Sequence, residues 1–158
     1  MLYALLKIVH WAAIVIWLGG MFFTLFCLRP AAHALPPPVR VPFMADVLGR
    51  FFKVVWWAAL LAVASGGGML MRAVQTTRQT GVAFNAPADW LFMAGVGVLM
   101  LVVFLYIRLV LYKRVQRAVA AQDWPAGGAA LNEIRFWVGA NLTFGALVIV
   151  AVVLGSVS

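Results

Sequence analysis

Acidic residues and cysteine are scarce in this chain of 158 residues, which contains four Asp and Glu in all and one Cys. A single cysteine excludes an internal disulfide and a Cys-x-x-Cys thiolate pair. Carboxylate pairs within an apolar run, Gly-rich phosphate loops and His-Glu-x-x-His motifs are also absent, so hydrolytic or nucleotide-driven chemistry is not expected. Binding is therefore a more natural expectation than catalysis, and an enzyme of this composition would be a membrane oxidoreductase.

Apolar residues dominate what is present: 66% of the chain is hydrophobic, and 10% is charged. Such a chain has too little polar surface to cover a soluble fold. The net charge of +8 would suggest nucleic acid if the basic residues formed one soluble face. They lie instead at the ends of apolar runs, where contact with anionic lipid headgroups is favourable. We therefore expect a bilayer, with anionic lipids at the inner loops, and no nucleic acid as partner.

Long apolar runs predict the fold class, because each reaches the roughly 20 residues that cross a bilayer as a helix. We expect an all-α integral membrane four-helix bundle, in which residues 1–158 form one transmembrane domain. The first run is longer than the apolar core of a signal peptide, so we interpret it as a retained span. The predicted spans are residues 2–28, 51–71, 89–112 and 136–157.

Three connections join these spans. The first, from Arg29 to Pro42, is rich in proline, and we expect a stiff loop without helical continuity. The second ends at Asp89, a candidate N-cap for the third span. The third contains Asp123-Trp124-Pro125, with polar helix expected on either side.

Basic residues predict the orientation, because short loops rich in Lys and Arg stay in the cytoplasm. The first and third connections with their flanks hold nine basic residues, against three on the other side: Lys7, Arg72 and Arg78. Both termini are therefore expected on the periplasmic side of a bacterial inner membrane. The nine are Arg29, Arg40, Arg50, Lys53, Arg108, Lys113, Arg114, Arg117 and Arg135.

One face of the first span carries its polar residues at intervals of three and four. Lys and His are costly against lipid, so we expect this stripe to face the other three helices. The only histidine within a span, His10, would lie roughly 12 Å below the outer end of its helix. The stripe comprises Tyr3, Lys7, His10, Ile14, Trp17, Met21 and Thr24.

Methionines reach a similar depth on two other spans: Met69 and Met71 on the second, Met93 and Met100 on the third. Imidazole and thioether together suit Cu(I), which prefers soft ligands. The first hypothesis is therefore a copper-handling protein with His10 and these four methionines as metal ligands, acting in binding or transport. His33 is excluded from this site, because it lies about 34 Å from His10 at helical rise.

Two alternatives remain open. His and Met also ligate haem iron, so a b-type haem redox protein could use His10 and Met100, with Trp17, Lys7 and Arg108 as further cofactor contacts. Glycine-rich helices and methionines equally serve close packing, which favours a structural helper subunit without a cofactor. A second copy of the chain or a redox protein as partner is also left open.

Several segments resemble the copper-resistance D (CopD) family. They are Leu6 to His10, Trp17-Leu18-Gly19-Gly20-Met21-Phe22-Phe23, Leu28 to Ala32, Leu48 to Phe52 and Ser65-Gly66. The stretches Arg117 to Ala120, Asp123 to Pro125, Ile134-Arg135 and Asn141-Leu142 look like small four-helix relatives of that family. The resemblance implies copper handling in the membrane.

A more distant likeness is to HemJ, the four-helix membrane protoporphyrinogen oxidase. That family has a similar histidine and tryptophan in its first helix, corresponding here to His10 and Trp17. The likeness implies His10 as an axial haem ligand. The chain departs from the pattern because no histidine follows in its second to fourth spans.

Overall fold

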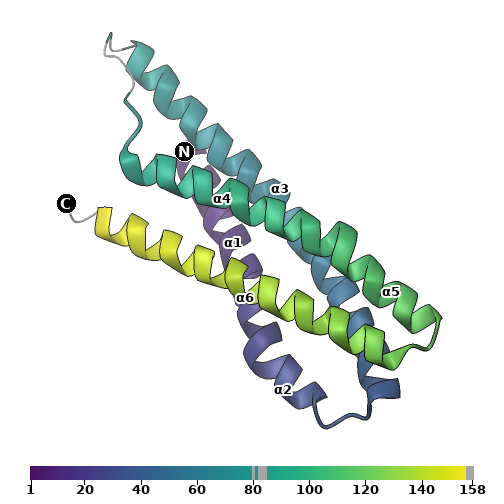
Figure 1. The fold of residues 1–158 in the computed structure, drawn as a ribbon. Helices are drawn as coiled ribbons and strands as arrows, with labels where there is room; N and C mark the ends of the chain where they lie inside the picture. The colour runs from purple at the N-terminus through teal and green to yellow at the C-terminus, as the bar shows by residue number, and fades with distance from the viewer. Residues whose placement is uncertain (80, 82–84, 156–158) are drawn as a thin grey trace.

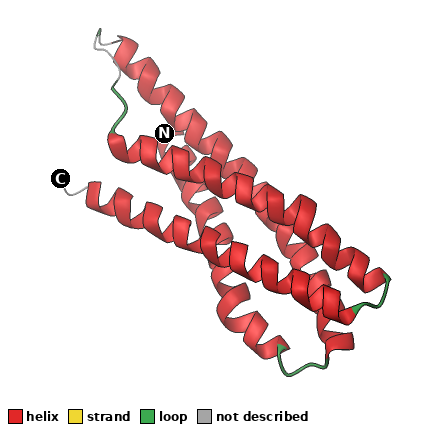
Figure 2. Ribbon diagram, viewed as in Figure 1, coloured by secondary structure: helices red, strands yellow, loops and turns green. Residues whose placement is uncertain are grey.

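The computed structural model describes residues 1–79, 81 and 85–155, and all regular structure in this part of the chain is helical (Figures 1 and 2). Two short π-helical segments are continuous with the α-helices that flank them. The elements are α1 (Leu2–Phe23), η1 (Thr24–Leu28), α2 (Arg29–Ala32), α3 (Pro37–Gln79), α4 (Ala88–Tyr106), η2 (Ile107–Leu111), α5 (Tyr112–Ala120) and α6 (Trp124–Gly155).

Four continuous helices are long and apolar enough to cross a membrane, as the sequence predicts: Leu2–Ala32, Pro37–Gln79, Ala88–Ala120 and Trp124–Gly155. The two termini lie at the same end of the bundle (Figure 1). We call this end outer and the opposite end inner, following the orientation predicted from the basic residues.

The helices associate in two close pairs, α1 with α3 and α4 with α6. The pairs join most tightly towards the inner end, where α3 and α6 both pack against α5. Phe52, Leu111 and Val115 are almost completely buried there, with exposed fractions of 1% or less. The inner half of the bundle therefore has a well-packed apolar core.

The predicted loop from Arg29 to Pro42 is wrong over most of its length. The first helix continues to Ala32, and α3 begins at Pro37 and includes Pro42. Proline is tolerated in the first turn of a helix, where backbone N–H groups have no intrahelical partner. The proline cluster therefore marks the beginning of α3.

Proline also explains how the first helix continues past Pro30. This residue has no N–H for the carbonyl of Phe26, four residues earlier. The chain responds with the π turn of η1, in which the N–H of Arg29 bonds to the carbonyl of Thr24. The wider turn accommodates the loss of this hydrogen bond, so the helix continues past Pro30.

Asp89 does not cap α4, contrary to the prediction. The helix begins one residue earlier, at Ala88, and Pro87 occupies the N-cap position. Asp89 lies in the first turn, where its negative charge is favourable to the helix dipole. The polar helices expected on both sides of the third connection are confirmed as α5 and the beginning of α6.

Candidate functional site

His10 turns its ring from α1 towards α3. Its Nδ1 lies 2.9 Å from the carbonyl oxygen of Ala62 and 3.1 Å from Oγ of Ser65. Ser65 is 2% exposed, and its hydroxyl donates back to the carbonyls of Leu61 and Ala62 within α3. The imidazole predicted to avoid lipid therefore has polar partners inside the bundle.

These partners define the tautomer of His10. The carbonyl of Ala62 can only accept a hydrogen bond, so Nδ1 must carry the proton and donate it. Nε2 of the neutral ring then keeps its lone pair. It has no hydrogen-bond partner among residues 1–79, 81 and 85–155. A histidine whose other ring nitrogen donates to a backbone carbonyl has the arrangement typical of metal-ligating histidines.

Glycines on α3 bring the two helices close enough for this contact. A Cβ atom at Gly66 would lie 3.3 Å from Cε1 of His10, and one at Gly68 would lie 3.2 Å from Leu6. Both are closer than ordinary van der Waals contacts. Ser65 therefore provides a polar partner for His10, and Gly66 leaves the space that the imidazole needs.

Two observations show how α4 is placed along α1. Tyr3 and Trp90 line one outer cavity together, and the rings of Trp17 and Phe104 meet with centroids 5.9 Å apart. Both intervals, Tyr3 to Trp17 and Trp90 to Phe104, span fourteen residues, or about four helical turns. His10 lies halfway along the first interval, and Gly97 lies halfway along the second. The two residues are therefore at the same level along the bundle axis.

Space is available at that level. A Cβ atom at Gly97 would meet nothing within 4 Å, and α1 and α4 have no extensive backbone contact. Met93 and Met100 precede and follow Gly97 by four and three residues, so all three share one face of α4. The structure thus brings two of the predicted methionines to the face of α4 at the level of His10.

Met69 and Met71, the two predicted ligands on α3, lie in different surroundings. Met69 follows Ser65 by four residues, so it lies on the same face of α3, one turn nearer the outer end. Met71 is 64% exposed, on the outside of the bundle. Thioethers that could approach Nε2 of His10 are therefore Met93, Met100 and, one turn outward, Met69.

The three remaining predicted site residues do not gather around His10. Lys7 is exposed. Trp17 is buried in the core against Phe104, in the same apolar cluster as Met100. Arg108 lies in η2, with its guanidinium 5.2 Å from the ring centre of Tyr112, so it belongs to the inner half of the bundle.

An open cavity lies at the outer end of the bundle. It measures about 550 Å³ and is lined by α1, α3 and the beginning of α4, through Met1, Leu2, Tyr3, Arg72, Ala73, Thr76, Thr77 and Trp90. Tyr3 is two turns outward from His10 along the polar stripe. The stripe is therefore buried at its inner end, at Trp17, Met21 and Thr24, and open at its outer end.

Ser65 is the residue of this site that sequence reasoning missed as a functional partner. A signal was present, because Ser65 is the only hydroxyl residue in the apolar run from 51 to 71. A buried hydroxyl in a membrane span needs a hydrogen-bond partner, and the imidazole of His10 is a candidate at similar depth. No group of three or more His, Cys, Asp and Glu side chains gathers among the described residues.

Comparison with known families decides the relationship. The profile of the family Copper resistance protein D (CopD) matches residues 45–154, more than half of the chain. The chain belongs to the CopD family. It is thus a multi-pass inner-membrane protein related to copper resistance. The match includes Ser65, Gly66, Met93, Gly97 and Met100, whereas His10 lies before it. No curated protein and no solved structure is significantly similar to this CopD protein.

Proposed function

We propose that this CopD protein binds Cu(I) through Nε2 of His10 together with the thioethers of Met93 and Met100. The observation that carries the proposal is the hydrogen bond from Nδ1 of His10 to the carbonyl of Ala62. That bond holds the ring and leaves Nε2 as a free donor of its lone pair. Nitrogen and thioether sulfur form a soft ligand set that suits Cu(I) better than harder cations.

The location supports capture of copper from the outer side. The cavity between Tyr3 and Trp90 opens at the outer end, two turns from His10. Further in, the bundle is filled by Trp17, Phe52 and Phe104, each with an exposed fraction of 7% or less. We therefore favour binding, sensing or transfer of copper at the outer face over passage of the ion through the bundle.

The direct test is a Cu(I) titration of the purified protein against a chromophoric chelator, with His10→Ala and His33→Ala compared. His33 is exposed beyond α2, so it is a matched control for loss of an imidazole. We expect His10→Ala to weaken Cu(I) binding by at least about tenfold, since even loss of a ligand's outer partner costs that much. His33→Ala should bind like the parent.

Equal affinities in the parent and His10→Ala would overturn the proposal. Absorption spectra of the same samples distinguish the two alternatives. A Soret band that disappears in His10→Ala would instead assign a b-type haem protein, with Met100 as the second ligand to examine. A colourless protein without stoichiometric copper would favour the structural helper subunit.

A further inference from the structure

Three arginines cluster at the inner end of the bundle without a carboxylate partner. Arg29 and Arg135 line the same small depression between the first helix, α3 and α6, and the positive charges of Arg135 and Arg40 both act on Arg29. The nearest partner of Arg29 is neutral: its Nη2 donates to Oδ1 of Asn132 at 3.0 Å. Burial and like charge both disfavour this arrangement unless an anion is present.

The acidic residues of the chain are engaged elsewhere. Glu133 pairs with Arg114 and Asp46 pairs with Arg50, both at 3.1 Å. Asp123 accepts from the N–H of Ala126, and Asp89 lies at the outer beginning of α4. Among the described residues, neither ion pair includes a member of the arginine cluster, so its positive charge is not neutralised within the chain.

A shallow apolar depression lies beside this cluster. Arg29 and Arg135 lie at its edge, and its open volume is about 10 Å³, enough for about one water molecule. Its walls come from η1, α3 and α6. The apolar lining is formed by Leu25, Met44, Leu48, Leu131, Ile134 and Val138.

We propose that the cluster of Arg29, Arg40 and Arg135 binds the phosphate of an anionic phospholipid, whose acyl chains lie over the apolar side chains beside the cluster. Guanidinium groups are the usual phosphate donors in proteins. Basic pockets between transmembrane helices near a membrane surface suit lipid headgroups. The apolar side chains directly beside the charges favour a phospholipid over free phosphate, because acyl chains cover such side chains and free phosphate does not. The site is separate from His10 and does not depend on copper.

The test measures binding of phosphatidylglycerol to the full chain in detergent by native mass spectrometry. Phosphatidylcholine with the same acyl chains and inorganic phosphate serve as the other two probes. We compare the parent with Arg29→Gln/Arg135→Gln. The control is Lys113→Gln/Arg117→Gln, which removes equal charge from exposed positions on α5 at the same end of the bundle.

We expect the parent and the control to bind phosphatidylglycerol in preference to phosphatidylcholine. Each arginine removed should weaken that binding by about fivefold, so the double variant should lose about 25-fold. Arg135 is exposed, so Arg135→Gln alone keeps the fold and should still show the single loss. Equal losses in the control pair would overturn the site, as would displacement of the lipid by millimolar inorganic phosphate.

Discussion

The imidazole of His10 and the backbone of Gly66 approach so closely that a methyl group on Gly66 would lie 3.3 Å from Cε1 of the ring. The hydrogen bond from Nδ1 to the Ala62 carbonyl depends on this approach. The position of the imidazole therefore depends on the absence of a side chain at Gly66. A substitution of Gly66 can move the ring without altering His10 itself.

Gly66→Val should displace the ring of His10 and weaken Cu(I) binding by about tenfold, the usual cost of disturbing an outer partner of a ligand. Gly67→Val is the matched control, because a Cβ atom at Gly67 would meet nothing within 4 Å. Chelator competition measures both. Unchanged affinity in Gly66→Val, with the fold retained, would contradict the role of this contact.

Gly97→Leu should abolish stoichiometric Cu(I) binding, because the new side chain would occupy the space between Met93 and Met100. No proposed ligand is altered by this change. Gly95→Leu adds the same side chain two residues away, on the exposed side of α4, where a Cβ atom is also free of contacts. If the two variants bind copper equally, the ion does not occupy the space at the level of His10.

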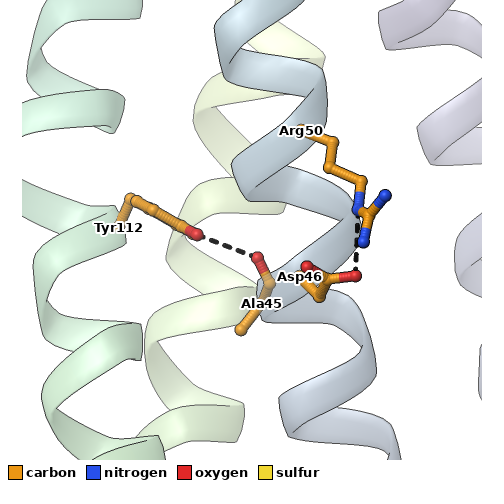
Figure 3. A network of polar contacts seen from close by, with 4 residues as sticks. All are labelled: Ala45, Asp46, Arg50 and Tyr112. Carbon is orange, nitrogen blue, oxygen red and sulfur yellow. Dashed lines mark hydrogen bonds and ion pairs between the residues drawn. The ribbon is translucent and has the colours of Figure 1, made fainter.

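Gly49→Ala should destabilise the inner half of the bundle without affecting copper. Tyr112 reaches α3 from one side and donates to the Ala45 carbonyl at 3.0 Å, while Arg50 and Asp46 pair on another side (Figure 3). A Cβ atom at Gly49 would overlap the Tyr112 hydroxyl, and overpacking of this kind costs about 1–3 kcal/mol.

Thermal unfolding in detergent checks this effect, with Gly139→Ala as control, since a Cβ atom there is free of contacts. Tyr112→Phe removes the clashing oxygen, so Gly49→Ala/Tyr112→Phe should recover part of the loss caused by Gly49→Ala. If the effects of Gly49→Ala and Tyr112→Phe on the unfolding temperature simply add, the clash is not the cause of the loss in Gly49→Ala.

Asn141→Leu should leave thermal stability unchanged or raise it. The Oδ1 atom of Asn141 has no hydrogen-bond partner among the described residues, and the residue is 1% exposed. An unsatisfied buried polar group costs about 1–3 kcal/mol, and leucine has a similar volume. A fall in unfolding temperature comparable to that of Gly49→Ala would mean that the amide has a partner.

The fold followed from hydropathy because four apolar runs of sufficient length have few other solutions in a membrane. The buried inner part of the polar stripe, from Trp17 to Thr24, also followed from helical period. The ends of the helices could not be predicted in this way, since the prolines at 37 and 38 are compatible with either a loop or the first turn of a helix, and Pro42 lies inside α3.

The candidate site could be predicted only in part. Sequence placed His10 inside the bundle and methionines at similar depth, but period alone does not reveal which helices are neighbours. The partnership of His10 with Ser65 and the common level of His10 and Gly97 depend on packing between helices. For the same reason Met71 could not be separated beforehand from Met93 and Met100.

X-ray absorption at the copper edge of the Cu(I)-loaded protein measures directly which atoms surround the copper ion. We expect imidazole nitrogen and thioether sulfur to be bonded to the ion. The sulfur contribution should be lost in Met93→Leu/Met100→Leu and kept in Met71→Leu. Bonding to nitrogen or oxygen alone in the parent protein would contradict this expectation.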